Sequence, residues 1–135
     1  MINRLQKSMD EKDKGFTLVE LLVVIVIIGI LAAIAIPLFL NQREKGVEAG
    51  MKSDLKSLAT LEETYFVDNG KYSANVSDFA PGATGDYNFK QTGANQVTVV
   101  SANVDGFCLH ATNTDYTDLE WWYDSQDGGL KDTAC

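Results

Sequence analysis

The chain opens with a short polar stretch and then changes abruptly into a long apolar run. Half of the first 14 residues are charged, whereas residues 16–40 contain a single ionisable side chain, that of Glu20. As an α-helix, residues 16–40 extend ~37 Å, which exceeds the ~30 Å hydrocarbon core of a bilayer. The pattern therefore predicts a membrane-spanning helix with one acid near its start.

A cleaved secretory signal peptide is the first alternative for this run. Its apolar region is only ~7–15 residues long and ends at a site with small residues. The run here is longer, and Ile36-Pro37-Leu38-Phe39 is bulky where such a site needs small side chains. We therefore expect the apolar segment to stay with the protein.

Beyond residue 40 the composition turns polar, but apolar side chains recur every three or four residues, which is the period of an amphipathic helix. Together with the apolar run, this predicts one helix from Phe16 to about Phe66 that ends at Asp68-Asn69-Gly70. Pro37 removes a backbone hydrogen bond, so we expect a kink near it, helped by Gly29. The predicted buried stripe consists of Val47, Met51, Leu55, Leu58, Leu61 or Glu62, and Tyr65.

The C-terminal half has the two-residue alternation and turn residues of β-structure. Strands are expected at 87–89, 96–101 and 106–111, after a loop over 73–85, and they form an antiparallel meander on the helix stripe. For residues 121–125 the sequence predicts a short fourth strand or an ordered loop, with one of the two tryptophans in the core. The predicted fold class is α+β, with a long N-terminal helix packed on a small antiparallel head.

Charge narrows the range of partners. The sequence has 11 basic and 19 acidic residues, for a net charge of −8. Four basic and three acidic residues precede Phe16, so the remainder carries 7 basic and 16 acidic residues and a charge of −9. Phosphate backbones are bound by clustered Lys and Arg, so no direct nucleic-acid partner is expected. No nucleophile motif surrounds the Ser, His and Asp residues, so we expect neither an enzyme nor a cofactor.

The two cysteines, Cys108 and Cys135, suit a disulfide in a small exported head better than a metal site. Two free thiols in a reducing compartment are the alternative. A bridge would close a loop of about 27 residues and contribute ~3.5 kcal/mol in the chain-entropy model. A calcium ion bound by the C-terminal aspartates could cross-link the same region, since hard cations take oxygen ligands. These aspartates match no known calcium-loop spacing, so no metal is expected. Those acids are Asp115, Asp118, Asp124 and Asp127.

The junction Lys14-Gly15 before Phe16-Thr17-Leu18-Val19-Glu20-Leu21-Leu22 resembles the type III signal of type IV prepilins and pseudopilins. The resemblance continues through Gly29, Ala32-Ala33 and Ile36-Pro37, and the helix end around residues 65–72 also resembles that of pilins. It implies that a membrane aspartyl protease, the prepilin peptidase, cuts after Gly15 and that the new N-terminus, Phe16, is N-methylated. The resemblance also favours the disulfide, because many pilins have a disulfide that cross-links the C-terminal part of the head.

The resemblance divides the chain into four parts. Residues 1–15 are a cleaved leader, 16–40 a hydrophobic transmembrane and polymerisation helix, 41–66 its amphipathic half, and 67–135 the head. In the family, the acid corresponding to Glu20 neutralises the amine of a neighbouring subunit, here that of Phe16. The local alternative is that an acid in a first helical turn is favoured by the macrodipole and satisfies its own backbone donors.

The function implied is a structural subunit that polymerises with copies of itself into a helical pilus-like filament through the assembly machinery. Four basic residues precede the apolar run and four follow it closely (Arg43, Lys45, Lys52 and Lys56), which leaves the membrane orientation open, whereas a disulfide requires the head to face an oxidising space. We therefore expect a cytoplasmic-membrane precursor with its head outside and an extracellular filament after assembly. The alternatives are a pseudopilin of type II secretion or competence, and a stationary single-pass membrane protein with an acidic ligand-binding ectodomain.

Overall fold

The computed structural model describes residues 15–135, so all of the predicted leader except Gly15 lies outside the described residues. The chain divides into two compact units, one ending at Asn41 and the other running from Gln42 to Cys135. The long helix α2 spans Leu18–Asn69, and a single 3₁₀ turn, η1, follows at Val76–Phe79. Four strands complete the second unit: β1 (Asn95–Ala102), β2 (Phe107–Asn113), β3 (Glu120–Asp124) and β4 (Gly129–Lys131).

The helix α2 ends three residues later than predicted, at the stop signal named above. Gly70 has a φ of 72°, a left-handed value that glycine adopts without steric cost. Its N–H donates to the Phe66 carbonyl at 2.7 Å, and the Asn69 side chain donates to the Tyr65 carbonyl at 3.0 Å. These bonds satisfy carbonyls that a helix end leaves free. The helix assignment passes Gly29 and Pro37 without interruption, and the kink there stays a prediction.

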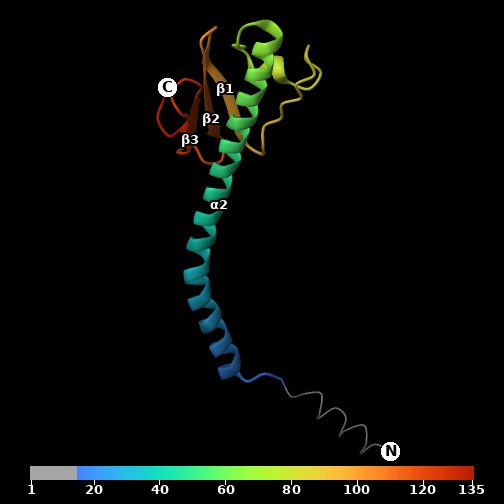
Figure 1. Cartoon of the computed structure of the whole chain (residues 1–135). Helices are drawn as coiled ribbons and strands as arrows, with labels where there is room; N and C mark the ends of the chain where they lie inside the picture. Colours follow the sequence, from blue (N-terminus) through green and yellow to red (C-terminus); the bar gives the residue numbers. More distant parts are fainter. Residues whose placement is uncertain (1–14) are drawn as a thin grey trace, which may run out of the picture. The chain divides into compact units, whose positions relative to one another are not determined.

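The four strands form one antiparallel sheet in the order β1-β2-β3-β4. Val97 pairs with Ala111, and Leu109 pairs with Tyr123, so the apolar side chains of successive strands share one face. Figure 1 shows this sheet beside the part of α2 that belongs to the second unit. Residues 120–124 form a strand rather than a loop, and β4 is a short strand that the sequence did not predict.

The strand predicted at 87–89 is wrong. Asn88 has a φ of 53°, which no strand residue adopts, and these residues join no ladder. Phe89 instead donates its N–H to the Phe79 carbonyl at 2.6 Å, and the Tyr87 ring packs edge-on against the Phe79 ring at 5.5 Å. The alternation of aromatic and polar residues therefore reflects anchoring of a loop on the core.

The core lies between α2, η1 and the inner face of the sheet. Met51, Leu55 and Leu58 are fully buried, which confirms the central part of the predicted stripe. Of the two alternatives for the next position of the stripe, Glu62 is fully buried and Leu61 is only partly buried. Trp121 packs against this core from β3. The residues that meet the stripe from the other elements are Phe79, Val97, Phe107, Leu109 and Ala111.

Candidate functional site

The start of α2 is fixed by two hydrogen bonds between Thr17 and Glu20. The Glu20 N–H donates to Thr17 Oγ1 at 3.1 Å, and the Thr17 N–H donates to Glu20 Oε2 at 2.8 Å. This reciprocal pair is a capping box, which satisfies two of the backbone donors that a helix start leaves free. Glu20 therefore satisfies a backbone donor at the start of its own helix, which is the local role given above as the alternative to intersubunit pairing. Only the Oε2 oxygen of its carboxylate takes part in the capping box.

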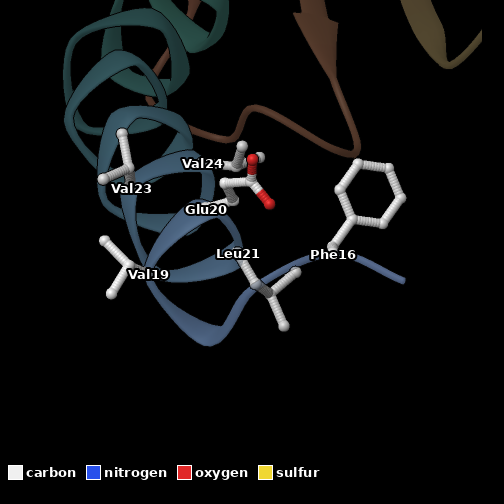
Figure 2. A pocket seen from close by; sticks show the side chains of 6 residues that line it. All are labelled: Phe16, Val19, Glu20, Leu21, Val23 and Val24. Atoms are coloured by element: carbon white, nitrogen blue, oxygen red, sulfur yellow. The ribbon is translucent and has the colours of Figure 1, made fainter. Parts of the chain in front are cut away.

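Around this cap lies an apolar hollow of ≈ 610 Å³ with Glu20 as its one ionisable side chain. Figure 2 shows the Glu20 carboxylate on the side of the helix where Phe16 lies, with Val19 and Val23 on the other side in this view. The structure thus brings together two of the predicted site residues, Phe16 and Glu20. The lining consists of Phe16, Val19, Glu20, Leu21, Val23 and Val24.

The apolar part of α2 is almost completely uncovered. Phe16 is 92% exposed, and the large apolar side chains between Leu18 and Leu40 are 50–80% exposed. Uncovered apolar surface of this extent marks a membrane or a protein interface. Within the described residues, α2 is the one helix long and apolar enough to cross a membrane, as judged by length and composition.

Gly15 precedes the helix in an open position. A Cβ placed on it would meet nothing within 4 Å, and its backbone is not in the left-handed region. Gly15 and Phe16 are both exposed, so the peptide bond between them is accessible. The fold of this chain therefore does not require a glycine at this position.

In the head, Cys108 and Cys135 form a disulfide, with their Cα atoms 6.2 Å apart. Cys108 lies on β2 and is buried, whereas Cys135 is exposed beyond β4. The bond ties the C-terminal segment to the second strand of the sheet. The alternative of two free thiols does not hold in this structure.

Two of the four acids near the C-terminus, Asp124 and Asp127, lie around a lysine. Lys131 Nζ lies 2.9 Å from Asp127 Oδ2 and 3.7 Å from Asp124 Oδ2. A cation at this position would compete with the lysine for the same oxygens. Across residues 15–135, no three or more His, Cys, Asp or Glu residues are placed to hold a metal ion.

Sequence reasoning missed a buried acid on α2, Asp54, which is 4% exposed. Its Oδ2 accepts hydrogen bonds from the Thr92 N–H at 2.9 Å and the Asn95 Nδ2 at 2.8 Å, and its Oδ1 accepts one from the Thr92 hydroxyl at 2.7 Å. Asn95 accepts in turn from Asn113 Nδ2 at 2.7 Å. This chain of hydrogen bonds joins α2 to β1 and β2. Its partners are 38 and 41 residues away, so local spacing gives no signal for it.

The comparisons with known proteins agree with these features. Residues 11–36 match the family model of the prokaryotic N-terminal methylation motif. The type IV wide pilus major component PilA4 of Thermus thermophilus is 35% identical over 121 residues, which cover 89% of this chain and 87% of that protein. The chain belongs to the type IV pilin and pseudopilin family.

Other relatives match a shorter part of this pilin-family chain. The type IV major pilin PilA of Myxococcus xanthus is 40% identical over 85 residues, which cover 62% of this chain and 39% of that protein. The type II secretion system core protein G of Dickeya chrysanthemi is 38% identical over 64 residues, which cover 47% of this chain and 42% of that protein. The chain thus spans about two fifths of the length of these two relatives.

Proposed function

We propose that this protein is a structural subunit of a type IV pilus-like filament. The prepilin peptidase cuts it after Gly15, Phe16 is then N-methylated, and copies of the mature chain polymerise through α2. The observation that carries the proposal is Glu20, the single acid in the uncovered apolar part of α2, which lies beside the residue that becomes the new N-terminus. The open environment of Gly15 supports the proposal, because a peptidase can reach the exposed peptide bond between Gly15 and Phe16.

Burying the Glu20 carboxylate in a membrane costs free energy. A carboxylate at the centre of a membrane helix costs ~2.5–3.5 kcal/mol, and less near the helix end. Cleavage gives Phe16 an ammonium group, and methylation leaves its positive charge in place. Opposite charges ~4 Å apart attract by ~4 kcal/mol at an effective dielectric constant of ~20. Pairing Glu20 with the Phe16 amine of a neighbour therefore offsets the cost of burying the carboxylate.

The capping box and the intersubunit pair are compatible. The Thr17 N–H uses Glu20 Oε2, and the capping box leaves Oε1 available to the amine of a neighbouring subunit. The single chain thus holds the carboxylate in place before assembly, which reduces the conformational entropy lost when the pair forms. We infer that Thr17 positions Glu20 for assembly.

A pilus is favoured over a secretion pseudopilus by the extent of the matches. The match to the Thermus pilus component covers 89% of this chain, head included, whereas the match to secretion protein G covers 47%. The partners are further copies of the same chain, the prepilin peptidase, the membrane and the assembly machinery. The precursor lies in the cytoplasmic membrane with its head outside, and the assembled filament is extracellular. The role of the subunit in this proposal is structural.

A stationary single-pass membrane protein is the alternative from another class. Its N-terminus would remain at Met1 or begin after residue 40, whereas a pilin begins at Phe16. N-terminal sequencing of the membrane-bound and sheared fractions separates the two. A methylated Phe16 at the terminus supports the proposal, and an intact leader in the mature protein contradicts it.

The role of the charge is tested by Glu20→Gln. Glutamine can replace glutamate in a capping box, so this variant keeps the helix cap and loses only the charge. We expect normal cleavage and membrane insertion but no filaments in the sheared fraction. Glu44→Gln, an exposed acid on the same helix outside the apolar run, is the matched control and should assemble normally. Filaments from Glu20→Gln at the wild-type yield would show that capping, rather than charge pairing, is what assembly requires.

A further inference from the structure

Like Asp54, Glu62 is a buried acid on α2, and no positive charge in the described part of the chain balances it. Its side chain is fully buried in the head. Its Oε2 accepts a hydrogen bond from the Ser73 N–H at 2.8 Å, and its Oε1 has no hydrogen-bond partner among the described residues. None of the salt bridges found within residues 15–135 involves Glu62. A charged carboxylate is costly in such a place, whereas a protonated one is tolerated.

The ionisable groups around Glu62 favour its neutral form. Asp78 of η1 and Glu63 of α2 are both acidic and act on it by charge repulsion. Tyr72, in the segment after α2, donates its hydroxyl to Glu63 and carries no positive charge. Burial is the largest cause, and together with these acids it raises the pKa of Glu62 from 4.5 to about 7, against the opposing hydrogen bond from Ser73. The group therefore titrates near neutral pH.

Ser73 connects Glu62 to the segment between α2 and η1. Its N–H donates to Glu62, its hydroxyl lies within hydrogen-bond distance of an Asp78 carboxylate oxygen, and its side chain is 3% exposed. Asn75 then donates its N–H to Ser73 Oγ at 3.1 Å. The backbone that leaves α2 is thus held at one buried residue, between two carboxyl groups. Any change at Glu62 acts directly on this anchor.

We propose that Glu62 is a proton-operated latch on the segment 70–75: the neutral carboxyl keeps Ser73 docked against α2, and loss of the proton loosens that segment. An ionised Glu62 has one oxygen without a donor and two acidic neighbours, so it gains by opening to water. When the segment opens, water reaches Glu62 and its pKa returns to the ordinary value of 4.5. The latch is a property of the head and does not depend on filament assembly.

The test is hydrogen exchange at the Ser73 amide of the full-length protein in detergent micelles. After correction for the intrinsic exchange rate, the opening constant should rise about tenfold between pH 6 and pH 8, because the group titrates at about 7 when docked and at 4.5 when open. In Glu62→Gln the corrected constant should change by less than about twofold over the same range. Glu63→Gln, the exposed neighbouring acid, is the matched control and should keep most of the pH dependence.

Two results would overturn the latch. One is a corrected wild-type opening constant that is independent of pH, and the other is a pH dependence that Glu63→Gln removes as completely as Glu62→Gln. If Glu62→Gln does not fold, an NMR titration of the wild-type protein tests the same proposal. The carboxyl carbon of Glu62, followed by NMR, should titrate near pH 7, and a midpoint near pH 4.5 contradicts the proposal.

Discussion

Replacing Asp54 by alanine removes the acceptor for three hydrogen bonds that join α2 to the sheet. Two of the donors belong to Thr92, which is exposed and can regain water, but the third is the amide of Asn95, which is 3% exposed. Hydrogen bonds to a charged group contribute ~1.5–3 kcal/mol, and an orphaned buried donor costs ~1–3 kcal/mol. We expect Asp54→Ala to lower the free energy of unfolding of the head by about 3 kcal/mol.

Asp54→Asn separates the hydrogen bonds from the charge. The amide oxygen can accept from the Thr92 N–H and from Asn95, and the amide N–H can donate to the Thr92 hydroxyl, which is also an acceptor. All three contacts then remain, without the strength that charge adds, so the loss should be about 1 kcal/mol. The two substitutions should therefore differ by about 2 kcal/mol.

Denaturant unfolding of the full-length protein in mild detergent measures both values. Tryptophan fluorescence reports on the head, because Trp121 packs on the core with Lys52 Nζ 3.7 Å from its ring centroid. Glu44→Ala, an exposed acid on the same helix, is the control and should change the unfolding free energy by less than ~0.5 kcal/mol. A loss below about 1 kcal/mol for Asp54→Ala, or equal losses for the two Asp54 variants, refutes the reasoning.

Three further predictions concern other parts of the chain. Gly15→Leu should block processing, which appears on a gel as precursor of full length; a normally shortened product contradicts the assigned cut. Cys108→Ser should lower the free energy of unfolding by ~3.5 kcal/mol, because it opens a loop of about 27 residues; an unchanged denaturant midpoint rules this out. The free energy of unfolding should fall by ~3 kcal/mol between about pH 4.5 and pH 7, since folded Glu62 keeps a proton that the unfolded chain releases. Glu62→Gln should remove that slope, and an equal slope in this variant excludes Glu62 as its source.

The elements that sequence reasoning found are those with strong local signals. The apolar run, the stripe through Met51, Leu55 and Leu58, and the stop at Gly70 each follow from periodicity or turn chemistry and are present in the structure. The strands β1 and β2 lie within two residues of their predicted bounds. The capping box was also readable, since Thr17 and Glu20 have the spacing of that motif.

What sequence reasoning missed depends on contacts distant along the chain. The sequence does not predict that Asp54 is buried, and it leaves the choice between Leu61 and Glu62 open, because a polar residue interrupts the apolar pattern of a buried helix face. Only the partners Thr92 and Ser73 explain the burial of these two acids. The error at 87–89 has the same origin, because Phe89 is buried by η1 rather than by a neighbouring strand. A strand of three residues such as β4 is too short for alternation to be recognised.

The central claim is that mature chains associate through Phe16 and Glu20, and a structure of the native filament at side-chain resolution tests it directly. Each subunit should begin at a methylated Phe16, and its amine should lie within hydrogen-bonding distance of Glu20 Oε1 of a neighbouring subunit. Thr17 of that neighbour should still donate its N–H to Oε2 of its own Glu20. A filament in which Glu20 contacts only its own Thr17, or in which the leader is still attached, contradicts the account.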